Sequence, residues 1–168
     1  MTQGIRGGWG ARPRWVWWVA AVWVIGFVEG AGVHAFDLLT GGLHAYGAWP
    51  LPSQVLFHAL LVLDPLAAVL VTRGRPAGPS LGAAVMVADL TANWWENWDG
   101  FVRHPLDYLQ GVVGLPAMTL FGLFVFTTAA PLRRAFHQAF NRAGRGMDPR
   151  EGEGADRSAD GDPRAQEV

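Results

Sequence analysis

The chain has 168 residues, of which 51% are apolar and 16% are charged, and it has a formal net charge of −1 and no cysteine. An ordinary soluble domain has about 25% charged residues, so this low share favours a membrane protein. The length excludes a large multidomain enzyme, the lack of cysteine excludes disulfides and Cys-ligated metal sites, and the near-zero charge gives no reason to expect a nucleic-acid partner.

Charge is distributed unevenly along the chain. Residues 15–132 contain ten Asp, Glu and Arg side chains, whereas the much shorter segment 143–168 contains eleven. We therefore expect a transmembrane domain over residues 15–132, preceded by a cytoplasmic segment over residues 1–14. Residues 143–168 have almost nothing to bury and are expected to form a disordered cytoplasmic tail.

Four stretches are long and apolar enough to cross the membrane. About 20 residues of helix are needed to span about 30 Å of hydrocarbon, and the stretches cover about residues 15–37, 51–72, 80–98 and 110–132. Soluble helices carry a polar stripe, whereas these stretches are apolar on nearly every face. The sequence therefore predicts an all-α fold, a membrane-embedded four-helix bundle.

Arginine placement predicts how the helices run. The chain has no Lys, and its Arg residues gather before the first stretch, between the second and third, and after the fourth. The other two connections contain only Arg103. Short cytoplasmic loops collect positive charge. We therefore expect a multi-pass protein of the plasma membrane, with the lipid bilayer as its partner and both termini in the cytoplasm.

Residues 133–142 continue an apolar pattern beyond the fourth stretch. Leu132, Phe136, Ala139 and Phe140 share one helical face, and the nearby arginines lie off that face. This pattern predicts a juxtamembrane amphipathic helix on the inner leaflet. A simple continuation of the fourth helix, with positive charge that stops transfer, would explain the same residues.

Several ionisable residues fall inside the predicted spans, where an Asp at the helix centre costs about 2.5–3.5 kcal/mol. A rise of about 1.5 Å per residue places nearly all of them in the outer half of the membrane. We therefore expect an outward-facing pocket of carboxylates and imidazoles. Its candidate catalytic residues are Glu29, Asp64, Asp89 and His58, and its other lining residues are His34, Asp37 and Asn93.

Helical spacing indicates which of these side chains share a direction. Asp89, Asn93 and Glu96 follow i, i+4 and i+7, so they form one stripe that must face other helices or a wet cavity. His58 and Asp64 are six residues apart and point in different directions on a straight helix. The proline after Asp64 tends to kink the helix and is expected to open it locally.

Three carboxylates and two imidazoles in one membrane region predict binding of, or acid–base chemistry on, a lipophilic small molecule. Such a site could move a double bond, protonate an olefin or bind a cationic amine. Asp64-Pro65-Leu66, with acidic residues on successive helices of a four-span protein, resembles the EXPERA group of sterol isomerase-like and sigma-2-receptor-like membrane proteins. The composition, rich in Ala, Gly, Val and Arg, resembles small four-span integral membrane proteins of high-GC bacteria.

Two other functions explain the same residues. Buried polar groups also hydrogen-bond between helices, so the chain could be a non-catalytic membrane subunit whose polar residues serve packing and assembly in a homo- or hetero-oligomer. The small pair Gly26 and Gly30 would let a neighbouring helix approach closely. Alternatively, His34 and His58 could ligate a haem or a divalent metal, together with an acidic residue.

Overall fold

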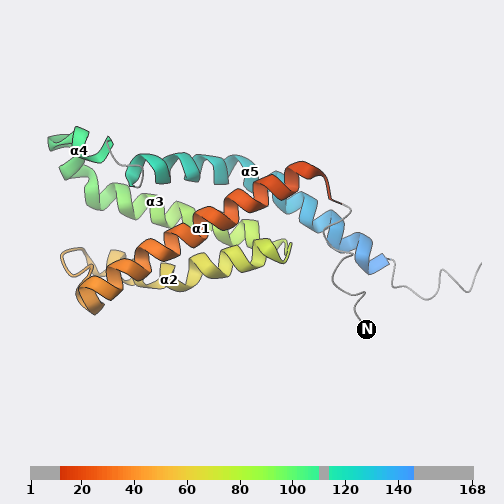
Figure 1. The fold of residues 1–168 in the computed structure, drawn as a ribbon, viewed down its shortest axis with the longest axis horizontal. Coiled ribbons are helices and arrows are strands. Elements are labelled where there is room, and N and C mark those ends of the chain that lie inside the picture. Colours follow the sequence, from red (N-terminus) through yellow and green to blue (C-terminus); the bar gives the residue numbers. More distant parts are fainter. Residues whose placement is uncertain (1–11, 110–113, 146–168) are drawn as a thin grey trace, which may run out of the picture.

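The computed structural model describes residues 12–109 and 114–145, and in these residues every regular element is a helix. The elements are α1 (Arg14–Gly41), a short 3-10 turn η1 (Gly42–His44), α2 (Leu51–Thr72), α3 (Ala77–Arg103), α4 (Pro105–Leu109) and α5 (Leu115–Arg145) (Figure 1). The predicted all-α class is confirmed. The predicted disordered tail and most of the predicted N-terminal segment lie outside the described residues.

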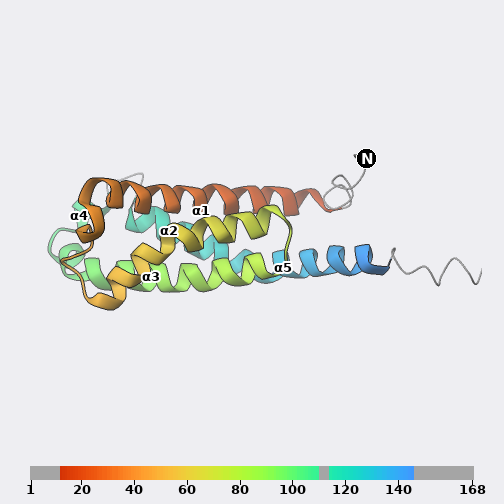
Figure 2. The same ribbon diagram turned by 90° about the horizontal axis from the view of Figure 1, so that it is seen from below.

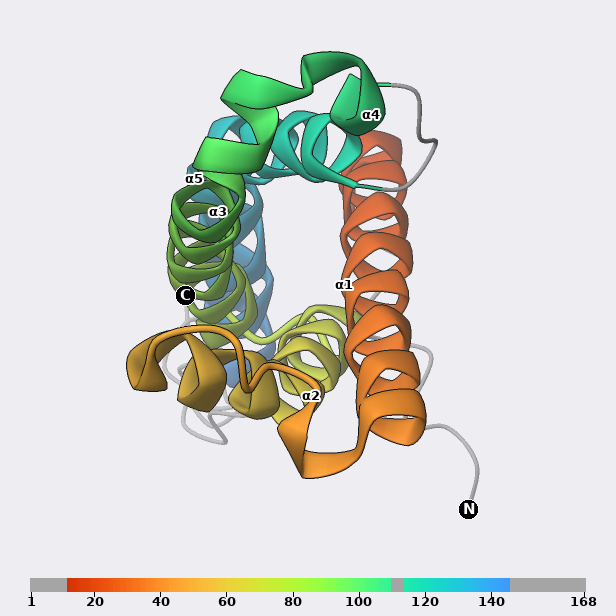
Figure 3. The same ribbon diagram turned by 90° about the vertical axis from the view of Figure 1, so that its left-hand side faces the viewer.

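Four long helices lie side by side along one axis (Figure 2). Each packs against two neighbours in the order α1, α2, α3 and α5, and α5 returns to α1, so α1 and α3 lie diagonally opposite. The start of α1, the α2–α3 turn and the last part of α5 lie toward one end, which we call the arginine end because Arg12, Arg73 and Arg75 lie there. We call the opposite end, with η1 and α4, the α4 end (Figure 3).

Three helical segments are long and apolar enough to cross a membrane: Arg14–His44, Leu51–Thr72 and Leu115–Arg142. α2 matches the predicted second stretch at both ends and runs on through Pro65, while α1 continues four residues beyond the predicted residue 37. α3, which contains the predicted third stretch, is long enough but less apolar because it carries Asp89, Glu96 and Asp99.

Most of the buried hydrophobic residues lie in the half nearer the arginine end. Trp23 and Phe27 of α1 are fully buried, and they reach the diagonal helix α3 at Gly82, where the absence of a side chain leaves room for both rings. The Trp23 indole Nε1–H donates a hydrogen bond of 2.9 Å to the Thr128 hydroxyl on α5. This half therefore has aromatic rings at its centre and a satisfied polar contact between helices.

α5 is one continuous helix through Pro131, so residues 133–142 form its C-terminal part instead of a separate helix. Leu132 and Phe136, two members of the predicted amphipathic face, are fully buried in the protein. The Arg12 guanidinium carbon lies 4.7 Å from the centre of the Phe136 ring. The residue two positions before α1 thus contacts the C-terminal part of α5. Contact of residues 133–142 with the inner leaflet stays a prediction.

Candidate functional site

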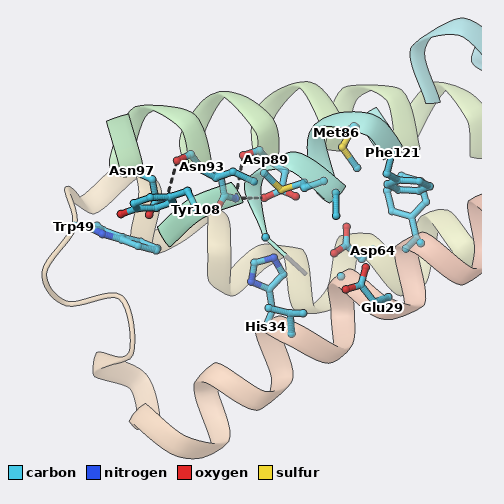
Figure 4. A pocket seen from close by; sticks show the side chains of 18 residues that line it. Glu29, His34, Trp49, Asp64, Met86, Asp89, Asn93, Asn97, Tyr108 and Phe121 are labelled. Carbon is cyan, nitrogen blue, oxygen red and sulfur yellow. Dashed lines mark hydrogen bonds between the residues drawn. The ribbon is translucent and has the colours of Figure 1, made fainter. Parts of the chain in front are cut away.

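A cavity of about 620 Å³ lies among the helices in the half nearer the α4 end (Figure 4). All four long helices, α4 and the α1–α2 connection contribute to its wall. Ligand pockets in proteins have volumes of about 300–1,000 Å³, so the cavity is large enough for a small organic molecule.

Three carboxylates from three helices line this cavity: Glu29 of α1, Asp64 of α2 and Asp89 of α3. Asp64 is 3% exposed and Asp89 is 8% exposed, so both are buried within the protein. In Figure 4 the Asp64 and Glu29 side chains point into the space between their helices, and Asp89 faces them from α3. The helices therefore bring together three acidic residues that are far apart in the sequence.

The two buried carboxylates differ in their partners. Asn93, one turn after Asp89, donates a hydrogen bond of 2.8 Å from Nδ2 to Asp89 Oδ1. The Asp64 carboxylate has no hydrogen-bond partner among the described residues, although a carboxylate can accept about four hydrogen bonds. It packs against α1 at Gly30, where a Cβ atom would lie 3.0 Å from Asp64 Oδ2. Asp64 is thus a buried acid in the cavity wall.

Gly26 and Gly30, the predicted small pair, contact two different helices. A Cβ atom at Gly26 would collide with the Phe121 ring of α5, whereas one at Gly30 would meet Asp64 of α2. The pair therefore does not form one close helix–helix contact. The missing side chain at Gly26 leaves room for the Phe121 ring in the cavity wall. The missing side chain at Gly30 leaves room for the Asp64 carboxylate.

The rest of the cavity wall is mainly apolar and aromatic. The Phe27 and Phe121 rings meet edge to face, with their centroids 5.6 Å apart, next to Met86 and Met118. Trp49, Asn97 and Tyr108 line the part toward the α4 end. Among the described lining residues, His34 is the only one that can carry a positive charge.

Two hydrogen bonds join neighbouring helices around the cavity without using its acids. Ser53 Oγ of α2 donates to Glu96 Oε1 of α3 at 2.5 Å. Trp94 Nε1 of α3 donates to Thr119 Oγ1 of α5 at 2.9 Å. Glu96, the predicted third member of the α3 stripe, therefore contacts α2 instead of the cavity, and Asn97 lines the cavity one turn after Asn93.

The two predicted imidazoles have different positions. His34 lines the cavity and is 8% exposed, and its Nδ1 lies 3.0 Å from the Tyr46 hydroxyl. His58 does not line the cavity: its Nδ1 is 2.7 Å from the Gln54 carbonyl of its own helix, and its ring packs edge-on against Tyr46. The structure therefore separates His58 from the carboxylates, because its position on α2 turns it away from Asp64.

Asp37, another predicted lining residue, also lies outside the cavity wall. It accepts a hydrogen bond of 3.1 Å from the Tyr46 hydroxyl at Oδ2. Two side chains, Tyr46 and His34, therefore connect Asp37 to the cavity.

The described residues do not group in a way that suits a metal ion. In residues 12–109 and 114–145, no three His, Asp or Glu side chains are close enough together to hold one. His34 and His58 each have Nδ1 in a hydrogen bond and both pack against the Tyr46 ring. The geometry gives no support to the predicted metal or haem ligands.

Some lining residues were missed by the sequence reading. Asn97 follows Asp89 and Asn93 at the next i+4 position, so the helical stripe itself could have identified it. Trp49 lines the cavity, whereas Tyr46 contacts the lining residue His34. Both belong to the connection after α1, whose path back over α2 has no periodic signal. Tyr108 comes from α4, a five-residue helix that hydropathy did not indicate.

Comparisons of the chain with protein-family models, with curated proteins and with solved structures give no match. The resemblance to EXPERA-type proteins therefore has no family match behind it.

Proposed function

We propose that the protein is a four-helix integral membrane protein in which α3 crosses the membrane together with the three apolar segments. α2 runs from the α4 end to the arginine end, and α5 starts again at the α4 end. If α2 and α5 both cross the membrane, the chain between them has to cross it in the direction opposite to α2. α3 has 27 residues, about 40 Å of helix, which is enough for this crossing.

The arginine end faces the cytoplasm in this proposal. Arg73 and Arg75 lie in the α2–α3 turn, and Arg133, Arg134 and Arg142 lie in the last turns of α5. Positive charge in short segments stays on the cytoplasmic side. Both termini are then cytoplasmic, the membrane is the plasma membrane, and the cavity lies in the outer half with its acidic lining toward the outside.

We further propose that the cavity binds a lipophilic small molecule. The observation that carries this proposal is Asp64, a buried carboxylate with no hydrogen-bond partner among the described residues, beside a cavity of about 620 Å³. A buried charge or polar group without a partner costs free energy. Such a cost is typical of a site that a ligand completes.

Helix assembly is less well supported as the purpose of these acids. Polar contacts between the helices come from Trp23–Thr128, Ser53–Glu96 and Trp94–Thr119. Interhelical hydrogen bonds in membranes contribute about 0.6 kcal/mol on average, and a residue has to make one to contribute. Asp64 makes none with the described part of the neighbouring helices, so it does not serve as such a contact.

The lining also limits the chemistry of the ligand. Carboxylates accept hydrogen bonds and attract positive charge, and the described wall supplies no Arg or Lys. Aromatic rings and methionines cover the remaining wall and favour an apolar body. The proposed ligand is a lipophilic molecule with a cationic or hydrogen-bond-donating group.

Three adamantane derivatives with one cage and different polar groups test this proposal. We expect aminoadamantane to raise the melting temperature of the detergent-solubilised protein most and adamantanol to raise it less, because the acids attract a cation. Adamantane carboxylate should leave it unchanged, because the acids repel an anion. A ligand at about 100 times its Kd adds about 2.7 kcal/mol of stability, which corresponds to a shift of several degrees.

The Asp64→Asn variant should lose most of the preference for the amine over the alcohol. Asp99→Asn is the matched control, because Asp99 is exposed and pairs with Arg103 on its own helix. It should keep the wild-type preference. Equal shifts with all three compounds, or no shift with any of them, would contradict the proposed function.

A further inference from the structure

A chain of hydrogen bonds leads from the cavity wall to Asp37. His34 Nδ1 lies 3.0 Å from the Tyr46 hydroxyl oxygen, and the same hydroxyl donates to Asp37 Oδ2 at 3.1 Å. His34 and Asp37 lie three residues apart on α1, and Tyr46 returns to them from the connection after η1. The contact thus joins a carboxylate, a phenol and an imidazole in series.

The direction of these hydrogen bonds follows from the number of hydrogens available. A tyrosine hydroxyl has one hydrogen, and Tyr46 gives it to Asp37. Burial and the nearby charge of Asp37 raise the pKa of Tyr46 well above its ordinary value, so the phenol keeps this hydrogen. The contact between Nδ1 and the hydroxyl therefore requires a hydrogen on Nδ1, and a neutral His34 has its lone pair on Nε2.

The His34 ring is also held in place by packing. It stacks on the Phe57 ring of α2 with a centroid distance of 5.7 Å and an interplanar angle of 27°, while Tyr46 packs on the same phenylalanine. Tyr46 is buried and contacts the His58 ring on another side. The imidazole therefore has a fixed plane and a fixed hydrogen-bond partner at one nitrogen.

Nε2 is the ring nitrogen of His34 that the described residues leave without a hydrogen bond. His34 belongs to the cavity wall. The acids elsewhere in the wall accept hydrogen bonds, and this nitrogen adds a further acceptor in a different direction.

We propose that Asp37 and Tyr46 are positioning residues that hold His34 with Nε2 unprotonated, so that the bound molecule donates an O–H or N–H hydrogen to Nε2. The ligand class narrows to lipophilic alcohols and amines that place a donor against His34. The hydrogen bond from the ligand to His34 rests on the proposed function, whereas the arrangement of Asp37, Tyr46 and His34 does not.

Nitrogen NMR of ¹⁵N-histidine-labelled protein in detergent tests the arrangement without any ligand. The spectrum is recorded at about pH 8, above the ordinary imidazole pKa of about 6.5. The chain has five histidines, and the His34→Gln variant assigns the His34 signals by their disappearance. We expect a single tautomer of His34 with a protonated Nδ1 and an unprotonated Nε2.

The Tyr46→Phe variant should convert this single tautomer into a mixture, because the acceptor for Nδ1–H is removed. Tyr108→Phe removes the other tyrosine hydroxyl of the chain, which forms no hydrogen bond with His34, and should leave the tautomer of the ligand-free protein as it is. A protonated Nε2 in the wild type, or the same tautomer populations in wild type and Tyr46→Phe, would overturn the proposed positioning. Melting curves of the variants identify any that fail to fold. Asp37→Ala, which removes the acceptor of the Tyr46 hydroxyl hydrogen, then serves as the second variant with the same expected direction.

Addition of adamantanol tests the ligand contact. It should shift the Nε2 signal, whereas adamantane, which has no hydrogen-bond donor, should not. If the tautomer is as proposed but both compounds leave Nε2 unchanged, the contact between ligand and His34 is wrong. The stabilisation by aminoadamantane and adamantanol would remain as a separate result about the proposed function.

Discussion

The same four helices build two unlike regions, one filled and one hollow. Toward the arginine end, Trp23 and Phe27 cross the centre of the molecule and reach Gly82 on the diagonal helix. Toward the α4 end, a cavity of about 620 Å³ occupies the corresponding space. The helices stay together in both regions, so the cavity is not the result of a loosely assembled fold.

Hydrogen bonding also differs between the filled region and the hollow region. In the filled region the buried Trp23 indole has its acceptor, Thr128. In the hollow region, the contacts between neighbouring helices pass around the cavity through Ser53–Glu96 and Trp94–Thr119. The acids that line the cavity are not needed for these contacts. The residues that hydrogen-bond between helices are therefore different from the acids that line the cavity.

The largest loss of stability is expected from a substitution in the filled region. Trp23→Ala should lower the free energy of unfolding by about 3–5 kcal/mol, because a fully buried ring and its hydrogen bond are lost. Thermal unfolding followed in detergent measures this effect. Trp95→Ala is the control, since Trp95 is 77% exposed, and it should change stability by about 0.5 kcal/mol or less. Similar losses for both variants would mean that the filled region does not anchor the fold.

Adding one methyl group to each region should have a smaller effect on stability, and the two regions should respond differently. Gly82→Ala places a Cβ atom 2.6 Å from the Trp23 ring and should cost about 1–3 kcal/mol through overpacking. Gly30→Ala displaces only the Asp64 carboxylate, which can move into the cavity. We expect it to change stability little and to reduce the stabilisation by aminoadamantane.

Gly32→Ala is the matched control on α1, because nothing lies within 4 Å of its added Cβ atom. It should be neutral or stabilising by up to about 1 kcal/mol, since alanine favours helix. A strongly destabilising Gly30→Ala, equal to Gly82→Ala, would show that the hollow region is as tightly packed as the filled one.

Helix positions could be predicted from the sequence because hydropathy depends on local composition. α2 begins and ends at the predicted residues, and α1 differs by one residue at its start and four at its end. The assignment of α3 was harder, because the residues that make the cavity polar also lower the hydropathy of that helix. Hydropathy therefore marks three segments as long and apolar enough to cross a membrane, and the crossing of α3 rests on the topology that we propose.

The acids of the cavity could also be predicted, since their depth along each helix follows from counting residues. Glu29, Asp64, Asp89 and Asn93 line one cavity. Counting residues could not determine whether His34 or His58 lines the cavity. His34 and His58 have similar depths, and only the fold of the connection with Tyr46 determines which ring reaches the cavity wall.

The stability of the ligand-free Asp64→Asn variant tests the central claim most directly. If Asp64 is available to a ligand and does not hold the helices together, removal of its charge should leave the melting temperature unchanged or raise it, and the added stabilisation by aminoadamantane should fall. A ligand-free variant that melts several degrees below the wild type, with the stabilisation by aminoadamantane unchanged, would contradict the account.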